Sequence, residues 1–115
     1  MKISRGDVVR VLFPNSNLHT SKRRPALVIQ ADQLGTGLPQ TLVAMISSNL
    51  ARAGHPSRVS VSLPSPAGIA AGLRTDSVIM TDNLATVADS EIDSVLGTLP
   101  DMLAVDAPLR KTLSL

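Results

Sequence analysis

The sequence predicts a mostly β fold of the α+β class, in which a small, strongly curved β-barrel is followed by a C-terminal helix. Short apolar stretches recur between turn-forming residues along most of the chain, and this pattern is typical of β-strands. With 115 residues the chain has the size of one domain around one core, so we assign residues 1–115 to a single domain. Phe13 is the only aromatic residue, and aliphatic side chains and Met must therefore fill the core.

Three strands are expected in the first half of the chain, over residues 7–13, 25–31 and 41–46. In the first of these, the two-residue period of a strand places Val9, Val11 and Phe13 on one face. The second is apolar at nearly every position, which indicates that both of its faces are buried. Polar loops are expected between the strands, at residues 14–24, 35–39 and 47–56.

Four further strands are expected in the second half, over residues 58–63, 76–80, 84–87 and 95–98. Residues 64–68 form a loop between the first two, and Asp82-Asn83 separates the two in the middle. The tail from Pro100 has the apolar spacing of a helix. Pro100 is compatible with this, because proline is tolerated in the first turn of a helix. Pro108 predicts a kink or an early end, since an interior proline costs a helix about 3 kcal/mol.

Composition excludes several classes of protein. The net charge of +2 is too small to indicate nucleic-acid binding by itself, although most Lys and Arg precede residue 75 and most carboxylates follow it. The absence of cysteine excludes disulfides and thiolate chemistry. Without a signal-peptide pattern or an apolar run of membrane-spanning length, we expect a cytoplasmic protein with no membrane partner. No clustered set of His or carboxylate ligands indicates a metal, and no cofactor is expected.

Three adjacent cations, Lys22, Arg23 and Arg24, precede the second predicted strand and could bind phosphate. Arg24 differs from its neighbours because Pro25 follows it, and a residue before proline is held in extended geometry. Pro25 fits best as the first residue of a strand, so Arg24 would stand stiffly at its end. A guanidinium there could bind a phosphate through two parallel hydrogen bonds. On spacing alone, a solvated cluster of loop charges is the favoured interpretation.

Three small polar residues, Ser47, Ser48 and Asn49, end the third predicted strand. Hydroxyl groups at the end of a strand can donate to a phosphate oxygen. The same residues also start turns, and on local sequence alone a turn is the favoured interpretation.

Taken in order, these segments resemble the MazF/PemK family of toxin ribonucleases. The matching segments are Gly6-Asp7, Arg24-Pro25, Ser47-Ser48-Asn49 and Gly72-Leu73-Arg74-Thr75-Asp76-Ser77-Val78. The resemblance covers essentially the whole chain and implies an SH3-like barrel that forms a homodimer. It also implies metal-independent, sequence-specific cleavage of single-stranded RNA, in which the adjacent 2′-hydroxyl attacks and leaves a 2′,3′-cyclic phosphate. A cognate MazE-like antitoxin, which binds DNA together with the toxin, would block the RNA groove.

The resemblance also assigns roles to residues. The catalytic Arg of the family falls on Arg24, and its catalytic Thr falls on Ser47, which keeps the hydroxyl but loses a methyl that restrains the rotamer. PemK-like members use a further Arg and Asp on a late strand. Asp82 matches this Asp, but Met80 occupies the position of the Arg. Asp82 is therefore expected to act as a base or to position an arginine.

Five residues are expected to bind substrate: His19, Lys22, Arg23, Ser48 and Asn49. Lys22 and Arg23 would hold flanking phosphates. His19 lies near a histidine found in some family members, although its spacing to Arg24 differs by about one residue, and a solvated loop histidine is the simpler explanation.

Two other functions use the same fold. A CcdB-like topoisomerase poison would share the barrel and the dimer. Proteins of that kind lack the combination of an Arg-Pro pair and a hydroxyl that this chain has. An inactive SH3-like interaction module is the second alternative, and peptide-binding grooves of that kind need aromatic residues that this chain lacks.

Overall fold

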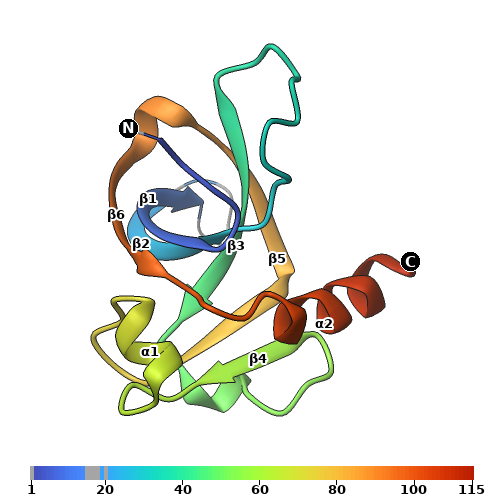
Figure 1. Cartoon of the computed structure of the whole chain (residues 1–115). Coiled ribbons are helices and arrows are strands. Elements are labelled where there is room, and N and C mark those ends of the chain that lie inside the picture. The colour runs from blue at the N-terminus through green and yellow to red at the C-terminus, as the bar shows by residue number, and fades with distance from the viewer. Residues whose placement is uncertain (1, 15–18, 20) are drawn as a thin grey trace.

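The computed structural model describes residues 2–14, 19 and 21–115, and six antiparallel strands dominate it. They are β1 (Asp7–Pro14), β2 (Ser21–Val28), β3 (Gln40–Ser47), β4 (Arg58–Val61), β5 (Ser77–Ala88) and β6 (Ile92–Thr98). Their order in the sheet is β4-β5-β3-β2-β1-β6, and the sheet is strongly curved (Figure 1). The mostly β fold with a C-terminal helix is confirmed. The pairings of the described strands leave β4 and β6 as the two edges, so closure into a barrel stays a prediction.

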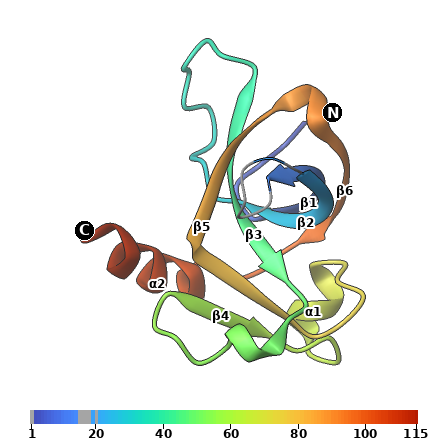
Figure 2. The same ribbon diagram turned by 180° about the vertical axis from the view of Figure 1, so that it is seen from behind.

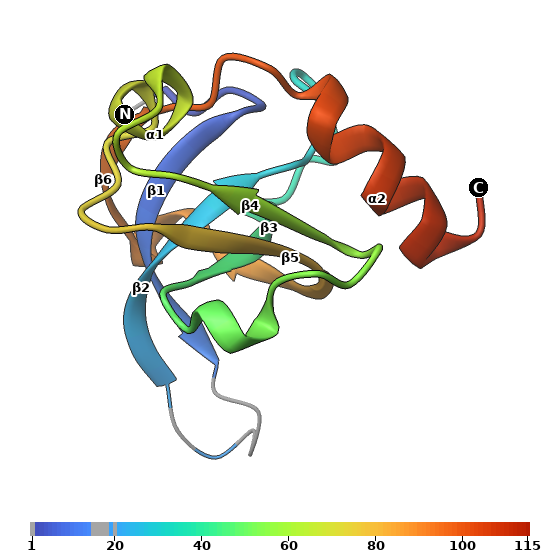
Figure 3. The same ribbon diagram turned by 90° about the horizontal axis from the view of Figure 1, so that it is seen from below.

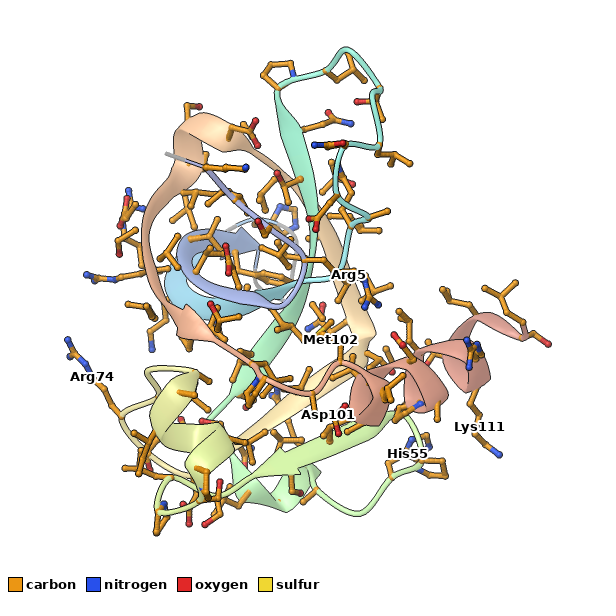
Figure 4. The ribbon with its side chains drawn as sticks, in the orientation of Figure 1. Arg5, His55, Arg74, Asp101, Met102 and Lys111 are labelled. Atoms are coloured by element: carbon orange, nitrogen blue, oxygen red, sulfur yellow. The ribbon has the colours of Figure 1, made fainter. Side chains whose placement is uncertain are left out.

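The helical elements are α1 (Pro66–Ala70), α2 (Leu103–Leu113) and two short 3-10 turns, η1 (Leu50–Arg52) and η2 (Asp89–Glu91). Helix α2 contacts β4 and β5, and Figure 3 shows it beside these two strands. Neither α1 nor α2 is long and apolar enough to cross a membrane. Arg5 ties α2 to the start of the chain, because its Nη2 lies 2.7 Å from Asp106 Oδ1 and its Nε donates to the carbonyl of Ile29 at 3.0 Å (Figure 4).

The central strands β2 and β3 are buried on both faces. Leu27 and Ala44 belong to one apolar cluster, which also contains Val105 of α2. Ala26 and Val43 belong to a second cluster on the other side. The predicted burial of the second strand on both faces is therefore confirmed.

Several element bounds differ from those the sequence predicts. Strand β2 begins at residue 21 rather than 25, because it continues its ladder with β1 through the basic segment. Strand β6 begins at residue 92 rather than 95, also through pairing with β1. Part of the loop predicted at residues 14–24 lies outside the described residues.

The predicted turn at Asp82-Asn83 is wrong, because β5 continues through it as one strand. The register between β5 and β3 shifts here. Just before this position, the polar groups of Thr81 bind to Ser57, next to β4, and not to β3. The main-chain N–H and the hydroxyl of Thr81 both donate to the carbonyl of Ser57, at 3.0 and 2.6 Å. The same hydroxyl also lies 2.8 Å from that of Thr112 on α2.

The helices also depart from the expectation. Helix α2 begins at Leu103, where Asp101 Oδ1 accepts the main-chain N–H, and it runs through Pro108 to Leu113. The predicted early end at Pro108 is therefore wrong. Helix α1 lies where a loop was expected, and Ser65 caps it by accepting the N–H of Gly68 at 3.1 Å.

The segment after α1 packs its main chain directly against β6. Gly72 has a φ of +70°, and a Cβ there would collide with the carbonyl oxygen of Leu96. A Cβ at Gly97 would likewise collide with Ala70 and Ala71. These two glycines let residues 72–75 lie beside the strands as one wall of the candidate site.

Candidate functional site

A pocket of about 470 Å³ lies where the basic start of β2 meets the end of β3. Figure 2 shows the end of β3 between α1 and β4, and residues of η1 and of the segment after α1 complete the lining. Among the described residues that line it, six are cations and none is a carboxylate. The cations are Arg10, Lys22, Arg23, Arg24, Arg52 and Arg74. Cations gathered in a concave site create a positive potential that attracts anions.

The register between β2 and β3 brings Arg24 and Ser47 together. Ala26 pairs with Met45 in this ladder. The same register, continued by two residues along each strand, places Arg24 opposite Ser47, and both residues line the pocket. Two residues distant in sequence, each predicted separately, therefore meet in one site.

Arg24 is held by the strand that carries it. Its main chain pairs with Val11 of β1, and Pro25 pairs with Arg10 in the same ladder. The side chain is half-buried and its Nε atom is buried. The ladder therefore fixes the main chain of Arg24, and the burial of Nε restricts the side chain before it meets a ligand.

Ser47 is buried and starts the turn that was the favoured local interpretation. Its Oγ accepts the main-chain N–H of Asn49 at 3.1 Å, and Asn49 Oδ1 accepts the N–H of Ala51 at 3.1 Å to cap η1. A hydroxyl that accepts one hydrogen bond can still donate its own proton. The turn therefore orients Ser47 without using its capacity to donate to an anion. Ser48 and Asn49 are exposed and line the same pocket.

The other predicted cations also lie in the pocket. Lys22 is exposed, and Arg23 pairs through Nη1 with Asp93 Oδ1 of β6 at 2.7 Å. Both partners of this ion pair are exposed, and exposed pairs contribute about 0–1 kcal/mol. Arg23 can therefore exchange Asp93 for a phosphate at small cost.

Three cations of the pocket were not predicted as site residues: Arg10, Arg52 and Arg74. Arg10 could have been found, because it lies between the inward-facing Val9 and Val11 and must face outward. Arg74 belongs to the segment that resembles the family, and it extends away from the ribbon (Figure 4). For Arg52, in a predicted loop, the sequence gives no comparable signal.

Two predicted residues are not among the described residues that line the pocket. His19 is exposed. Asp82 lies on β5 and pairs with Arg58 of β4: Nη2 donates to Oδ2 at 2.7 Å and Nε donates to Oδ1 at 3.3 Å. These hydrogen bonds are the main reason why the pKa of Asp82 is lowered and that of Arg58 is raised. A carboxylate with a lowered pKa is a weak base.

The donor set of the described residues does not suit a metal ion, because no three His, Asp or Glu side chains come together among them. The pocket instead presents guanidinium, ammonium and hydroxyl groups. These groups bind the oxygens of anions such as phosphates.

Comparison with known proteins gives a consistent result. Residues 4–113 match the family of PemK-like, MazF-like toxins of type II toxin-antitoxin systems. The endoribonuclease MazF2 of Mycobacterium bovis is 34% identical over 119 residues, covering 100% of both chains.

Solved structures of other proteins share the fold, and two are compared with this chain. An endoribonuclease in complex with its cognate antitoxin, from a mycobacterial species, has a TM-score of 0.75 at 17% identity, covering 99% of this chain and 97% of that one. MazF (form I) from Deinococcus radiodurans has a TM-score of 0.72 at 22% identity, covering 100% and 99%.

The pairing of Asp82 with Arg58 predicts that the stability of the folded protein depends on pH. The carboxyl group of an unperturbed Asp has a pKa of about 3.9, and the pKa of Asp82 in the folded protein is lower. The stabilisation from this pair is therefore complete above that value and is lost as the pH falls through the lowered pKa. Carbon-13 NMR of the carboxyl groups should show a depressed midpoint for Asp82 in the wild type. In Arg58→Ala the midpoint should return towards the ordinary value; an unchanged midpoint would exclude Arg58 as the cause.

Proposed function

Since the chain belongs to the PemK-like, MazF-like toxin family of type II toxin-antitoxin systems, we propose that it is an endoribonuclease toxin that cleaves single-stranded RNA in its basic pocket. The toxin domain would span residues 1–115 and act on mRNA in the cytoplasm. The observation that carries the proposal is that Arg24 and Ser47 line one pocket, whose described lining has six cations and no carboxylate.

The proposed reaction needs no metal, because the cations of the pocket supply the positive charge. The 2′-hydroxyl of one nucleotide gives its proton to a solvent water molecule and attacks the adjacent phosphorus, and the bond to the 5′-oxygen breaks to leave a 2′,3′-cyclic phosphate. Arg24 stabilises the dianionic phosphorane and donates a proton to the leaving 5′-oxygen. Ser47 donates to a non-bridging oxygen. Asp82 contacts Arg58 and is given no role at the reacting atoms.

The other residues of the pocket would hold the RNA strand. Lys22 and Arg23 bind flanking phosphates, and Ser48 and Asn49 contact the strand at the end of β3. His19 stays a predicted substrate contact in the segment before β2. Phosphate contacts of this kind position a strand without selecting its sequence, so the cleavage sequence must be selected by contacts to the bases.

Two protein partners belong to the proposal. An acidic, disordered segment of a MazE-like antitoxin would dock on the cations of the pocket and displace RNA. A mycobacterial relative of the same fold has been solved in complex with its cognate antitoxin, which supports a partner of this class. A second copy of the chain would form a homodimer, because a two-fold partner could cover the exposed Val95 and Leu96 of the edge strand β6.

Arg24→Ala should abolish RNA cleavage while the fold stays intact. Loss of a charge contact that is made mainly in the transition state should lower the rate by about 10²-fold or more. Arg24→Lys should also be poor, because an ammonium cannot replace the two-pronged guanidinium. Arg110→Ala removes the same charge from an exposed position on α2 and should cleave normally. Near-normal cleavage by Arg24→Ala would remove Arg24 from the mechanism.

Ser47→Ala should lose most of the activity, whereas Ser47→Thr should retain or improve it. Threonine keeps the hydroxyl, and its methyl restricts the rotamer. The matched control is Ser65→Ala, which removes a hydroxyl that caps α1 away from the pocket and should leave the cleavage rate unchanged. Initial rates on one RNA substrate compare the four proteins. An active Ser47→Ala protein would transfer the proposed role to Ser48 or Asn49.

A further inference from the structure

We infer that Arg52 is a further phosphate-binding residue of the pocket, and that Asp82 and Arg58 position it from outside. This inference rests on the proposed function, because it concerns how the same pocket holds RNA. It gives Asp82 a role that does not require contact with the substrate.

A chain of hydrogen bonds joins β5 to the end of η1 through a single guanidinium. Asp82 holds Arg58 through two hydrogen bonds, at 2.7 and 3.3 Å. The remaining nitrogen of that guanidinium, Nη1, donates to the main-chain carbonyl of Arg52 at 3.2 Å. Arg58 therefore fixes the main chain of Arg52 relative to the sheet, and Asp82 fixes Arg58.

The other contacts of Arg52 orient its side chain. Its main-chain N–H donates to the carbonyl of Asn49 at 3.2 Å, which closes η1. Its Nη1 lies 3.5 Å from the sulfur of Met80, a buried residue of β5. A guanidinium carries five N–H donors, and one weak contact to sulfur leaves enough of them for two-point binding of a phosphate. The half-buried side chain lines the pocket together with Arg24 and Ser47.

The composition of the pocket favours a phosphate over a base as the ligand of Arg52. No aromatic residue is among the described residues of the lining, and Phe13, the only aromatic residue of the chain, is buried. A single strand in this pocket has no ring on which to stack and is held mainly through its backbone charges.

Asp82→Asn distinguishes the positioning of Arg52 from a general effect of charge on RNA binding. Removing a negative charge near a basic pocket should strengthen RNA binding if only the overall field matters. If Asp82 positions Arg52, the same substitution should weaken binding, because Arg58 then loses its ionic partner and Arg52 its support. The two accounts therefore predict opposite signs.

The test measures binding of a non-cleavable 2′-O-methyl RNA oligonucleotide at several salt concentrations. Arg52→Ala should weaken binding about tenfold, the loss of one charge-assisted contact. It should also reduce the dependence of log K on log salt by about 0.7, the value for one phosphate on a single strand. Asp82→Asn should weaken binding several-fold in the wild-type background and should not weaken it when combined with Arg52→Ala. Arg110→Ala should bind like the wild type, and thermal unfolding checks that every variant is folded.

Each other outcome is informative. Tighter binding by Asp82→Asn, or an equal loss with and without Arg52, would overturn the positioning role. A loss in Arg52→Ala that varied with RNA sequence would show a base contact instead of a phosphate contact. If the wild type neither bound nor cleaved RNA, the proposed function itself would fail. A wild type that cleaves, with variants that are not coupled, would overturn this inference alone.

Discussion

The pairing of β2 with β3 is the constraint on which the site depends. Both strands bury side chains on both faces, so a slip of one residue would move each of them into the wrong cluster. The apolar residues therefore fix the register very firmly. Continued by two residues beyond the last pair of the ladder, this register places Arg24 across from Ser47, so the packing of apolar residues sets the position of two polar ones.

The strong positive charge of the pocket arises from how the carboxylates are distributed. Every aspartate of the chain accepts a hydrogen bond from an arginine, a hydroxyl or a main-chain N–H. Among these hydrogen bonds, only the one that Arg23 donates to Asp93 involves a residue of the described pocket lining. A chain with a net charge of only +2 can therefore present six cations in one place. Close main-chain packing at Gly72 and Gly97 adds Arg74 to them.

Much of the fold could be predicted because strands with alternating or fully apolar residues are encoded locally. The predicted element bounds are wrong where a residue distant in sequence determines the local structure. Thr81 continues β5 across a predicted turn because Ser57 and Thr112 satisfy its polar groups. The same holds for the site. Family resemblance points to Arg24 and Ser47, which both line the pocket, whereas Arg52 enters it through contacts with Arg58 and Met80 that no local pattern reveals.

Metal-independent cleavage is tested by incubating the purified protein with single-stranded RNA in the presence of EDTA and mapping the ends of the products. We expect cleavage without a divalent cation, with a 2′,3′-cyclic phosphate on the upstream fragment and a 5′-hydroxyl on the downstream fragment. Intact RNA, or cleavage that requires a divalent cation, would contradict this expectation.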